Sequence, residues 1–167
     1  MTGPRGSRQP KHRRSCHDRA LGLLAVRPRS RRELELRLLR AGFDRDEVAQ
    51  ELERLSAVGL VDDRRFAESF AEHAVGTKLA GRRAVFAALS ARGVDRATIE
   101  RTLAQVPGGE ADRAVELARL RATRLTGLPP EVAARRLVGF LARRGYEAGV
   151  ARRAAAAALG LEGDGSG

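Results

Sequence analysis

The residues of this chain that could bind a metal or act as a nucleophile are few and lie together near its N-terminus. Cys16 is the only cysteine, and His12 and His17 flank it in the pattern H-x-x-x-C-H. Three such ligands on a basic arm make a poor metal site, and Cys16 lacks an evident base partner that would generate a thiolate. The motifs G-x-x-x-x-G-K-[ST], G-x-S-x-G and H-E-x-x-H are absent. The sequence therefore predicts no metal, no cofactor and no enzymatic activity.

The adjacent carboxylates of Asp62 and Asp63 could in principle hold a cation or take part in acid–base chemistry. They follow the turn residues Gly59 and Leu60 and stand where a helix is predicted to begin. At a helix start, carboxylates cap free amide groups and interact favourably with the helix dipole. We therefore expect a structural role for this pair.

Arginine is the one chemically useful residue type that recurs at equivalent places. The chain has 32 Lys and Arg against 21 Asp and Glu, a net charge of +11, and only Lys11 and Lys78 are lysines. Biased codon usage can replace lysine by arginine, but it does not by itself create a surplus of positive charge. The surplus favours a polyanionic partner, either nucleic acid or an acidic protein surface. An ordinary solvated surface is the alternative.

Paired arginines stand near the start of the middle helix of each predicted repeat, where cations oppose the helix dipole. Their recurrence suggests a role in binding, at points roughly 20 Å or more apart along one side of stacked repeats. The predicted basic ridge comprises Arg31, Arg32, Arg82, Arg83, Arg92, Arg135, Arg136, Arg143, Arg144, Arg152 and Arg153.

The helices that position these arginines are marked by a short sequence motif that occurs three times in the chain, here called the repeated phrase. Residues 38–48 read LLRAGFDRDEV, residues 89–99 read LSARGVDRATI, and residues 141–151 read LARRGYEAGVA. Gly42, Gly93 and Gly145 are expected to end one helix in the left-handed conformation, and an acid two residues later to begin the next. Self-similarity with a period of roughly 50 residues predicts a tandem repeat.

Apolar spacing around each phrase predicts three helices in each repeat. The expected helices are 16–27, 30–42 and 44–58, then 64–76, 82–92 and 96–106, and then one from 110 through 125, one over 130–144 and an alanine-rich run ending at 159. Ser30 and Glu33 form a predicted capping box. Glu147 is a weaker cap than Asp44 or Asp95, so the last helix is expected to be the least secure.

The sequence thus predicts an all-α fold, with three tandem three-helix repeats forming an elongated, curved, solenoid-like array. The expected parts are a disordered basic arm at 1–15, repeats at 16–60, 61–107 and 108–160, and a flexible tail at 161–167. No segment is apolar over the roughly 18 to 20 residues that span a membrane. The basic N-terminus lacks the apolar run of a signal peptide. The single cysteine rules out a disulfide framework and is compatible with a reducing compartment, so we expect a cytoplasmic protein. We also expect it to be a monomer.

Three short motifs carry a resemblance to a known family. They are Ser30-Arg31-x-Glu33-Leu34, the junction Gly59-Leu60-Val61-Asp62-Asp63 followed by Phe66-Ala67, and Lys78-x-x-Gly81 before the middle helix of the second repeat. On these motifs the chain resembles the bacterial RecX regulatory proteins over about residues 18 to 160. The third repeat matches mainly in pattern. The structural motif of the family falls here on Ser30, Glu33, Leu34, Asp62, Asp63, Phe66, Gly42, Gly93 and Gly145.

The resemblance implies three tandem three-helix repeats and a non-enzymatic protein that binds the filament of RecA recombinase on single-stranded DNA. It implies modulation, mostly inhibition, of RecA strand exchange, ATPase and coprotease activity in DNA repair and the SOS response. The basic ridge would contact acidic RecA surface, DNA phosphates or both, with weaker binding to double-stranded DNA. Two alternatives stay open: an independent DNA-binding protein with helix-turn-helix-like contacts to phosphates, and a repeat scaffold for another protein.

Overall fold

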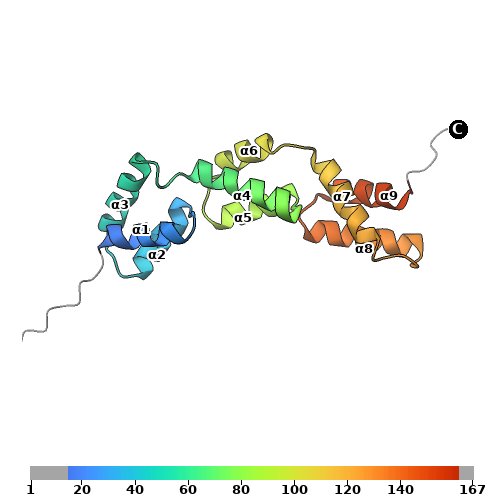
Figure 1. Ribbon diagram of the computed structural model, residues 1–167, viewed down its shortest axis with the longest axis horizontal. Helices are drawn as coiled ribbons and strands as arrows, with labels where there is room; N and C mark the ends of the chain where they lie inside the picture. The colour runs from blue at the N-terminus through green and yellow to red at the C-terminus, as the bar shows by residue number, and fades with distance from the viewer. Residues whose placement is uncertain (1–14, 162–167) are drawn as a thin grey trace, which may run out of the picture. The chain divides into compact units, whose positions relative to one another are not determined.

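The computed structural model describes residues 15–161, and within them the chain forms nine α-helices and no strand (Figure 1). The predicted all-α class is confirmed. His12 and most of the predicted basic arm and tail lie outside the described residues. The helices are α1 (Cys16–Val26), α2 (Arg31–Arg40), α3 (Arg45–Ala57), α4 (Asp63–Lys78), α5 (Arg82–Ala91), α6 (Arg96–Gln105), α7 (Glu110–Ala122), α8 (Pro130–Arg143) and α9 (Ala148–Leu159).

Capping side chains begin several helices where the sequence predicts them. The Ser30 hydroxyl accepts a hydrogen bond from the backbone N–H of Glu33 at 3.1 Å, and the Glu33 carboxylate accepts one from the backbone N–H of Ser30 at 3.4 Å. The carboxylates of Asp44 and Asp95 cap α3 and α6 by accepting hydrogen bonds from the backbone N–H groups of Asp46 at 2.8 Å and Thr98 at 2.9 Å. Glu147 makes no capping bond from its side chain, so the last helix lacks the cap that its two counterparts have.

The glycine of each repeated phrase adopts the left-handed conformation. The φ angles of Gly42, Gly93 and Gly145 are 92°, 77° and 90°. After each glycine, the next backbone N–H returns to a carbonyl near the helix end, as Phe43 does to Leu38 at 3.3 Å and Tyr146 does to Leu141 at 3.1 Å. The phrase therefore ends one helix and begins another in all three copies, as predicted.

The chain divides between Asp62 and Asp63 into two compact units. Unit 1 contains α1 to α3, whose apolar faces meet around Leu34, Leu38 and Leu55. Arg29 is buried in this unit, and its Nε donates to the carbonyl of Leu23 at 3.1 Å, which ties the α1–α2 connection to α1.

Unit 2 contains α4 to α9, the helices of the second and third repeats. The second repeat is built on Phe66, Val85 and Leu89, with Phe70 packed against them. The third repeat has an alanine-rich core formed by two clusters, in which Leu137 and Leu141 of α8 are fully buried. Small side chains allow α9 to pack closely against α7 and α8 despite its missing cap.

Main-chain hydrogen bonds join the second repeat to the third, a feature that the sequence pattern does not predict. The N–H of Gly81 donates to the carbonyl of Arg144 at 2.9 Å, and the N–H of Arg83 donates to the carbonyl of Gly145 at 3.1 Å. A Cβ at position 81 would overlap the backbone of Gly145, and one at position 145 would overlap Ala84. Gly145 is thus needed for close approach as well as for its φ angle.

Tyr146 closes this joint from the side of the third repeat. Its side chain is 1% exposed, and its hydroxyl donates to the carbonyl of Leu79 at 2.7 Å. Leu79 has a φ of 47°, unusual for a residue with a side chain. The guanidinium of Arg144 donates to the neighbouring carbonyl of Lys78 at 2.9 Å. Two side chains of the third repeat therefore hold the loop before α5 by its main-chain carbonyls.

Some predicted helix limits were wrong. α7 ends at Ala122 rather than continuing through Leu125, and Leu120 is 60% exposed. The chain turns between α7 and α8 with Gly127 at a φ of 86°, and Leu125 enters the core from that turn. α4 continues to Lys78, two residues beyond the predicted end at Gly76, so this glycine lies within the helix rather than at its end.

Candidate anion-binding interface

The arginine pair of the first repeat is already matched by acidic side chains. Arg31 Nη2 lies 2.6 Å from a carboxylate oxygen of Glu53, and Arg32 Nη1 lies 2.7 Å from one of Glu35. Both pairs are on the surface of unit 1, where such ion pairs contribute little to stability. The local charge of Arg31 and Arg32 is nevertheless balanced, which makes this pair the weaker attraction for an anion.

The arginine pair of the second repeat stands free at the start of α5. Arg82 and Arg83 are both exposed, and no side-chain ion pair forms at either one among residues 15–161. The backbone N–H of Arg82 donates to the Glu110 carboxylate at 2.8 Å. Glu110 therefore satisfies a free amide of α5, whose N-cap Gly81 has no side chain to do so.

Two arginines of the predicted ridge are engaged within unit 2. The guanidinium of Arg92 lies 4.7 Å from the ring centre of Phe70 and donates to the carbonyl of Ala88 at 2.7 Å. Arg144 binds the Lys78 carbonyl, as described above, and lies 5.4 Å from the ring centre of Phe140. These contacts hold both side chains against the protein.

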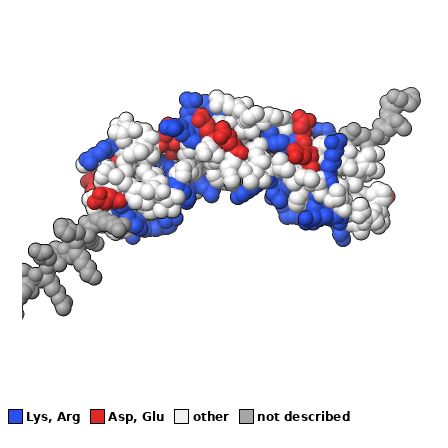
Figure 2. All heavy atoms as spheres, viewed as in Figure 1, with Lys and Arg blue, Asp and Glu red and all other residues white. Residues whose placement is uncertain are grey.

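The third repeat has a pocket with arginines on several sides. It has a volume of about 250 Å³ and lies between the end of α7 and the middle of α8. Its lining residues are Arg121, Leu125, Arg135, Arg136, Gly139, Phe140 and Arg143. Basic side chains gather over the part of the surface where Figure 1 places α8, as Figure 2 shows in blue at the lower right.

The local sequence explains why these side chains converge. α8 begins at Pro130, so Arg135 and Arg136 lie in its second turn rather than at its start. Residues 136, 140 and 143 follow the spacing of one helix face. The guanidinium of Arg121, from the last turn of α7, lies 5.1 Å from the ring centre of Phe140. The aromatic ring thereby places a cation of α7 beside those of α8.

Four members of this pocket were not predicted from the sequence as site residues: Arg121, Leu125, Gly139 and Phe140. The spacing of Arg136, Phe140 and Arg143 was a usable signal, because it puts an aromatic ring between cations on one helix face. Arg121 carried no such signal, since only the packing of α7 on α8 brings it near. The remaining ridge residues, Arg152 and Arg153, are exposed on α9 and line none of the pockets described here.

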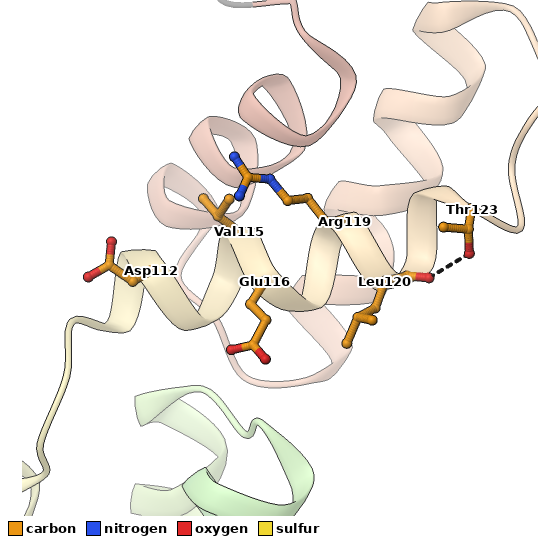
Figure 3. Close-up of a pocket in the computed structure, with 6 residues that line it drawn as sticks. All are labelled: Asp112, Val115, Glu116, Arg119, Leu120 and Thr123. Carbon is orange, nitrogen blue, oxygen red and sulfur yellow. Dashed lines mark hydrogen bonds between the residues drawn. The ribbon is translucent and has the colours of Figure 1, made fainter.

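A second pocket lies along the outer side of α7 (Figure 3). It is lined by Asp112, Val115, Glu116, Arg119, Leu120 and Thr123 and has a volume of about 570 Å³. All six residues belong to one helix or its C-cap, and the Thr123 hydroxyl donates to the carbonyl of Leu120 at 2.9 Å. A surface formed by a single helix offers no converging groups for chemistry.

The residues first considered for metal binding or nucleophilic chemistry take part in core packing, in an ion pair or in a helix start. Cys16 is buried, and burial together with the negative charges of Glu47 and Glu51 raises the pKa of its thiol to about 11. His17 Nδ1 lies 2.7 Å from a Glu51 carboxylate oxygen. No cluster of three potential metal ligands occurs within residues 15–161. Asp62 and Asp63 stand at the start of α4, as predicted.

None of the nine helices is long and apolar enough to span a bilayer, judged over residues 15–161.

Comparison with known proteins identifies the same three-helix pattern. Models of the first, second and third three-helix domains of RecX match residues 16–55, 62–103 and 109–155. The regulatory protein RecX of Mycolicibacterium smegmatis is 43% identical over 136 residues, which cover 78% of this chain and 72% of that protein. The regulatory protein RecX of Thermobifida fusca is 39% identical over 144 residues, covering 86% and 78%.

A solved structure agrees with this result at the level of the fold. The crystal structure of RecX from Lactobacillus salivarius matches with a TM-score of 0.76 at 21% identity, over 83% of this chain and 91% of that one. The predicted triple three-helix repeat is confirmed by the three domain matches. Sequence identity, domain content and fold all lead to one assignment: the chain belongs to the RecX family of regulatory proteins.

Proposed function

We propose that this protein regulates RecA recombinase by binding the RecA filament on single-stranded DNA, and that the effect is mostly inhibitory. The observation that carries the proposal is the match of all three RecX domains, in order, along one chain. The protein acts as a non-enzymatic monomer in the cytoplasm. It lowers RecA ATPase, strand-exchange and coprotease activity by occupying filament surface.

The charge distribution supports this proposal. A net charge of +11 favours a polyanion, and the filament offers one in its DNA phosphates. In unit 2, the arginines proposed to contact it are Arg82 and Arg83 on α5 and the group on α8, none of which forms a salt bridge among residues 15–161. Arg31 and Arg32 of unit 1, matched by Glu53 and Glu35, contribute less.

The direct test is the ATPase activity of RecA on single-stranded DNA with this protein added below the RecA concentration. We expect the rate to fall at substoichiometric ratios, because a protein seated along a filament affects several RecA subunits. A control variant in which Glu replaces Arg96 and Arg101 of α6 reverses two charges outside the proposed interface, and it should lower the rate as the wild type does. An ATPase rate that stays constant at every ratio would refute the proposal.

The second candidate is an independent DNA-binding protein, favoured by the exposed arginines at the start of α5. It predicts tight binding to DNA without RecA, with affinity falling steeply as salt rises. Titration of a labelled single strand and a labelled duplex at two salt concentrations decides between the two. We expect weak binding to both, weaker for the duplex, and strong binding only when RecA is present.

A further inference from the structure

We propose that the pocket between α7 and α8, lined by Arg121, Arg135, Arg136 and Arg143, is a specific binding site for a phosphate group. The site is a recess of about 250 Å³ in unit 2, where half-buried Arg121 of α7 meets three exposed arginines of α8. Its volume is below the range of about 300 to 1,000 Å³ typical of drug-sized ligands. It therefore suits a compact anion.

Unbalanced charge is the first argument. Four guanidinium groups line this small volume, and none of the four forms an ion pair with a carboxylate within residues 15–161. Like charges gathered at one place repel one another, and an anion bound among them removes that repulsion. Elsewhere on the chain, Arg27, Arg64 and Arg96 each lie within 3 Å of a carboxylate.

The chemistry of the donors is the second argument. A guanidinium group is planar, stays charged at any physiological pH, and offers parallel N–H donors that match two oxygens of a phosphate. A phosphate group with more than one negative charge makes fuller use of four such groups than a single carboxylate does. Diphosphate and a terminal nucleotide phosphate carry this charge on one compact group, and a nucleic-acid backbone offers it as neighbouring, singly charged phosphates.

The shape of the pocket is the third argument. Gly139 lies on the pocket-lining side of α8, and a Cβ there would stand 3.4 Å from Nη1 of Arg143. A methyl group at this position would only touch the guanidinium of Arg143, whereas a larger side chain would displace it or fill the recess. Phe140 positions Arg121, whose guanidinium is 5.1 Å from the ring centre. Two uncharged residues thus help to set the geometry of the cations.

The inference deepens the proposed function, in which the arginines of α8 contact DNA phosphates: it assigns phosphate binding to one recess that includes Arg121, and it is measured without RecA. Loss of RecA inhibition alone would leave the phosphate site standing, and absence of phosphate binding would leave RecA regulation standing. The test uses the full chain in three variant forms. R135Q/R136Q removes two pocket cations, and R96Q/R101Q removes two cations on α6. Gly139→Leu fills the pocket without changing the charge.

Binding is measured at low salt by calorimetry with inorganic diphosphate, and by fluorescence anisotropy with a labelled oligo(dT) that has no terminal phosphate. We expect wild-type protein to bind diphosphate, and both R135Q/R136Q and Gly139→Leu to bind it about tenfold more weakly. R96Q/R101Q should bind within about twofold of wild type. Circular dichroism of each variant verifies that helicity is unchanged.

Each remaining result decides the matter. If only oligo(dT) binds and only the two pocket variants weaken it, the phosphate comes from a nucleic-acid backbone and the site is upheld. Equal weakening by R96Q/R101Q and R135Q/R136Q would show diffuse attraction and overturn the proposal. So would wild-type affinity in Gly139→Leu, equal competition by citrate, which carries only carboxylates, or no binding of either phosphate ligand to wild type.

Discussion

At the scale of single residues, Tyr146 joins two parts of the chain that are far apart in sequence. Its buried hydroxyl donates to the Leu79 carbonyl across 67 positions. Burial raises the pKa of the phenol above its usual value, with the nearby acid Glu110 adding to the effect. An ionised phenolate could neither donate this bond nor remain buried without a large cost in free energy.

We predict that Tyr146→Phe lowers the free energy of unfolding by about 1 kcal/mol at pH 7, the usual contribution of one such bond. Because the folded-state pKa is raised, the stabilising effect of Tyr146 is fully present below the ordinary value near 10 and is lost as pH rises through the folded value. Urea unfolding of both proteins between pH 7 and pH 11 measures this. The difference between them should shrink at alkaline pH, and a difference independent of pH would contradict the role of the hydroxyl proton.

Cys16 illustrates how burial governs reactivity. Its thiol is 3% exposed and has a pKa raised to about 11, so the thiolate that reacts with alkylating agents is scarce at neutral pH. We predict that iodoacetamide modifies the native protein at pH 8 at least about a hundredfold more slowly than the protein unfolded in guanidinium. Mass spectrometry of timed samples gives both rates. Similar rates in the two states would show that Cys16 is accessible in the folded protein.

At the scale of helices and their connections, the repeated phrase accounts for most of what the sequence predicts correctly. Leucine, glycine and acid at fixed spacing determine a helix end and the next helix start, and these interactions are local. The joint between the second and third repeats is different, because its bonds link main-chain atoms near residue 81 to those near residue 145. Backbone atoms have no sequence signature, and Gly145 already had a sufficient explanation as a helix stop.

The same reasoning explains the errors in the third repeat. The apolar spacing of Leu117, Leu120 and Leu125 resembled a continuous helix face. Leu125, however, lies in the turn after α7 and reaches the core from there. Burial alone does not distinguish a helix from a turn. The arginine pocket was only half predictable for a similar reason: its α8 members share one helix face, whereas Arg121 depends on tertiary packing.

The close approach of Gly81 to Gly145 gives a prediction at this scale. Gly81→Ala should lower the free energy of unfolding of unit 2 by about 1 to 3 kcal/mol, because its Cβ would overlap main-chain atoms of Gly145 that cannot move aside. Gly76→Ala is the matched control. This position of α4 has open space around it, so alanine should leave stability unchanged or raise it by up to about 1 kcal/mol. Guanidinium unfolding compares the two, and equal effects would argue against a tight joint.

At the scale of the whole molecule, the positive charge is distributed unevenly between matched and unmatched arginines. In unit 1, Arg31 and Arg32 have acidic neighbours at 2.6 Å and 2.7 Å. In unit 2, Arg82 and Arg83 are exposed, and no salt bridge forms at them among residues 15–161. A net count of charges cannot reveal this difference, because it depends on which side chains meet after folding.

We predict that replacing Arg82 and Arg83 by Glu weakens inhibition of the RecA ATPase. The concentration of this protein that is required for inhibition should rise by about tenfold or more. Reversal at Arg31 and Arg32 should have a smaller effect, since their charge is already balanced. Helicity, measured by circular dichroism, should be the same in both variants. Inhibition by the Arg82 and Arg83 variant at the wild-type concentration would exclude these residues from the interface.

The joint held by Tyr146 also bears on how the protein is made. A ribosome adds about 5 to 20 residues per second, so the 67 positions between Leu79 and Tyr146 correspond to several seconds of synthesis. Throughout that interval the loop before α5 has none of its partners from the third repeat, and the left-handed conformation of Leu79 lacks the bond from Tyr146. This loop therefore reaches its final conformation late, when the third repeat of the nascent chain packs against the second.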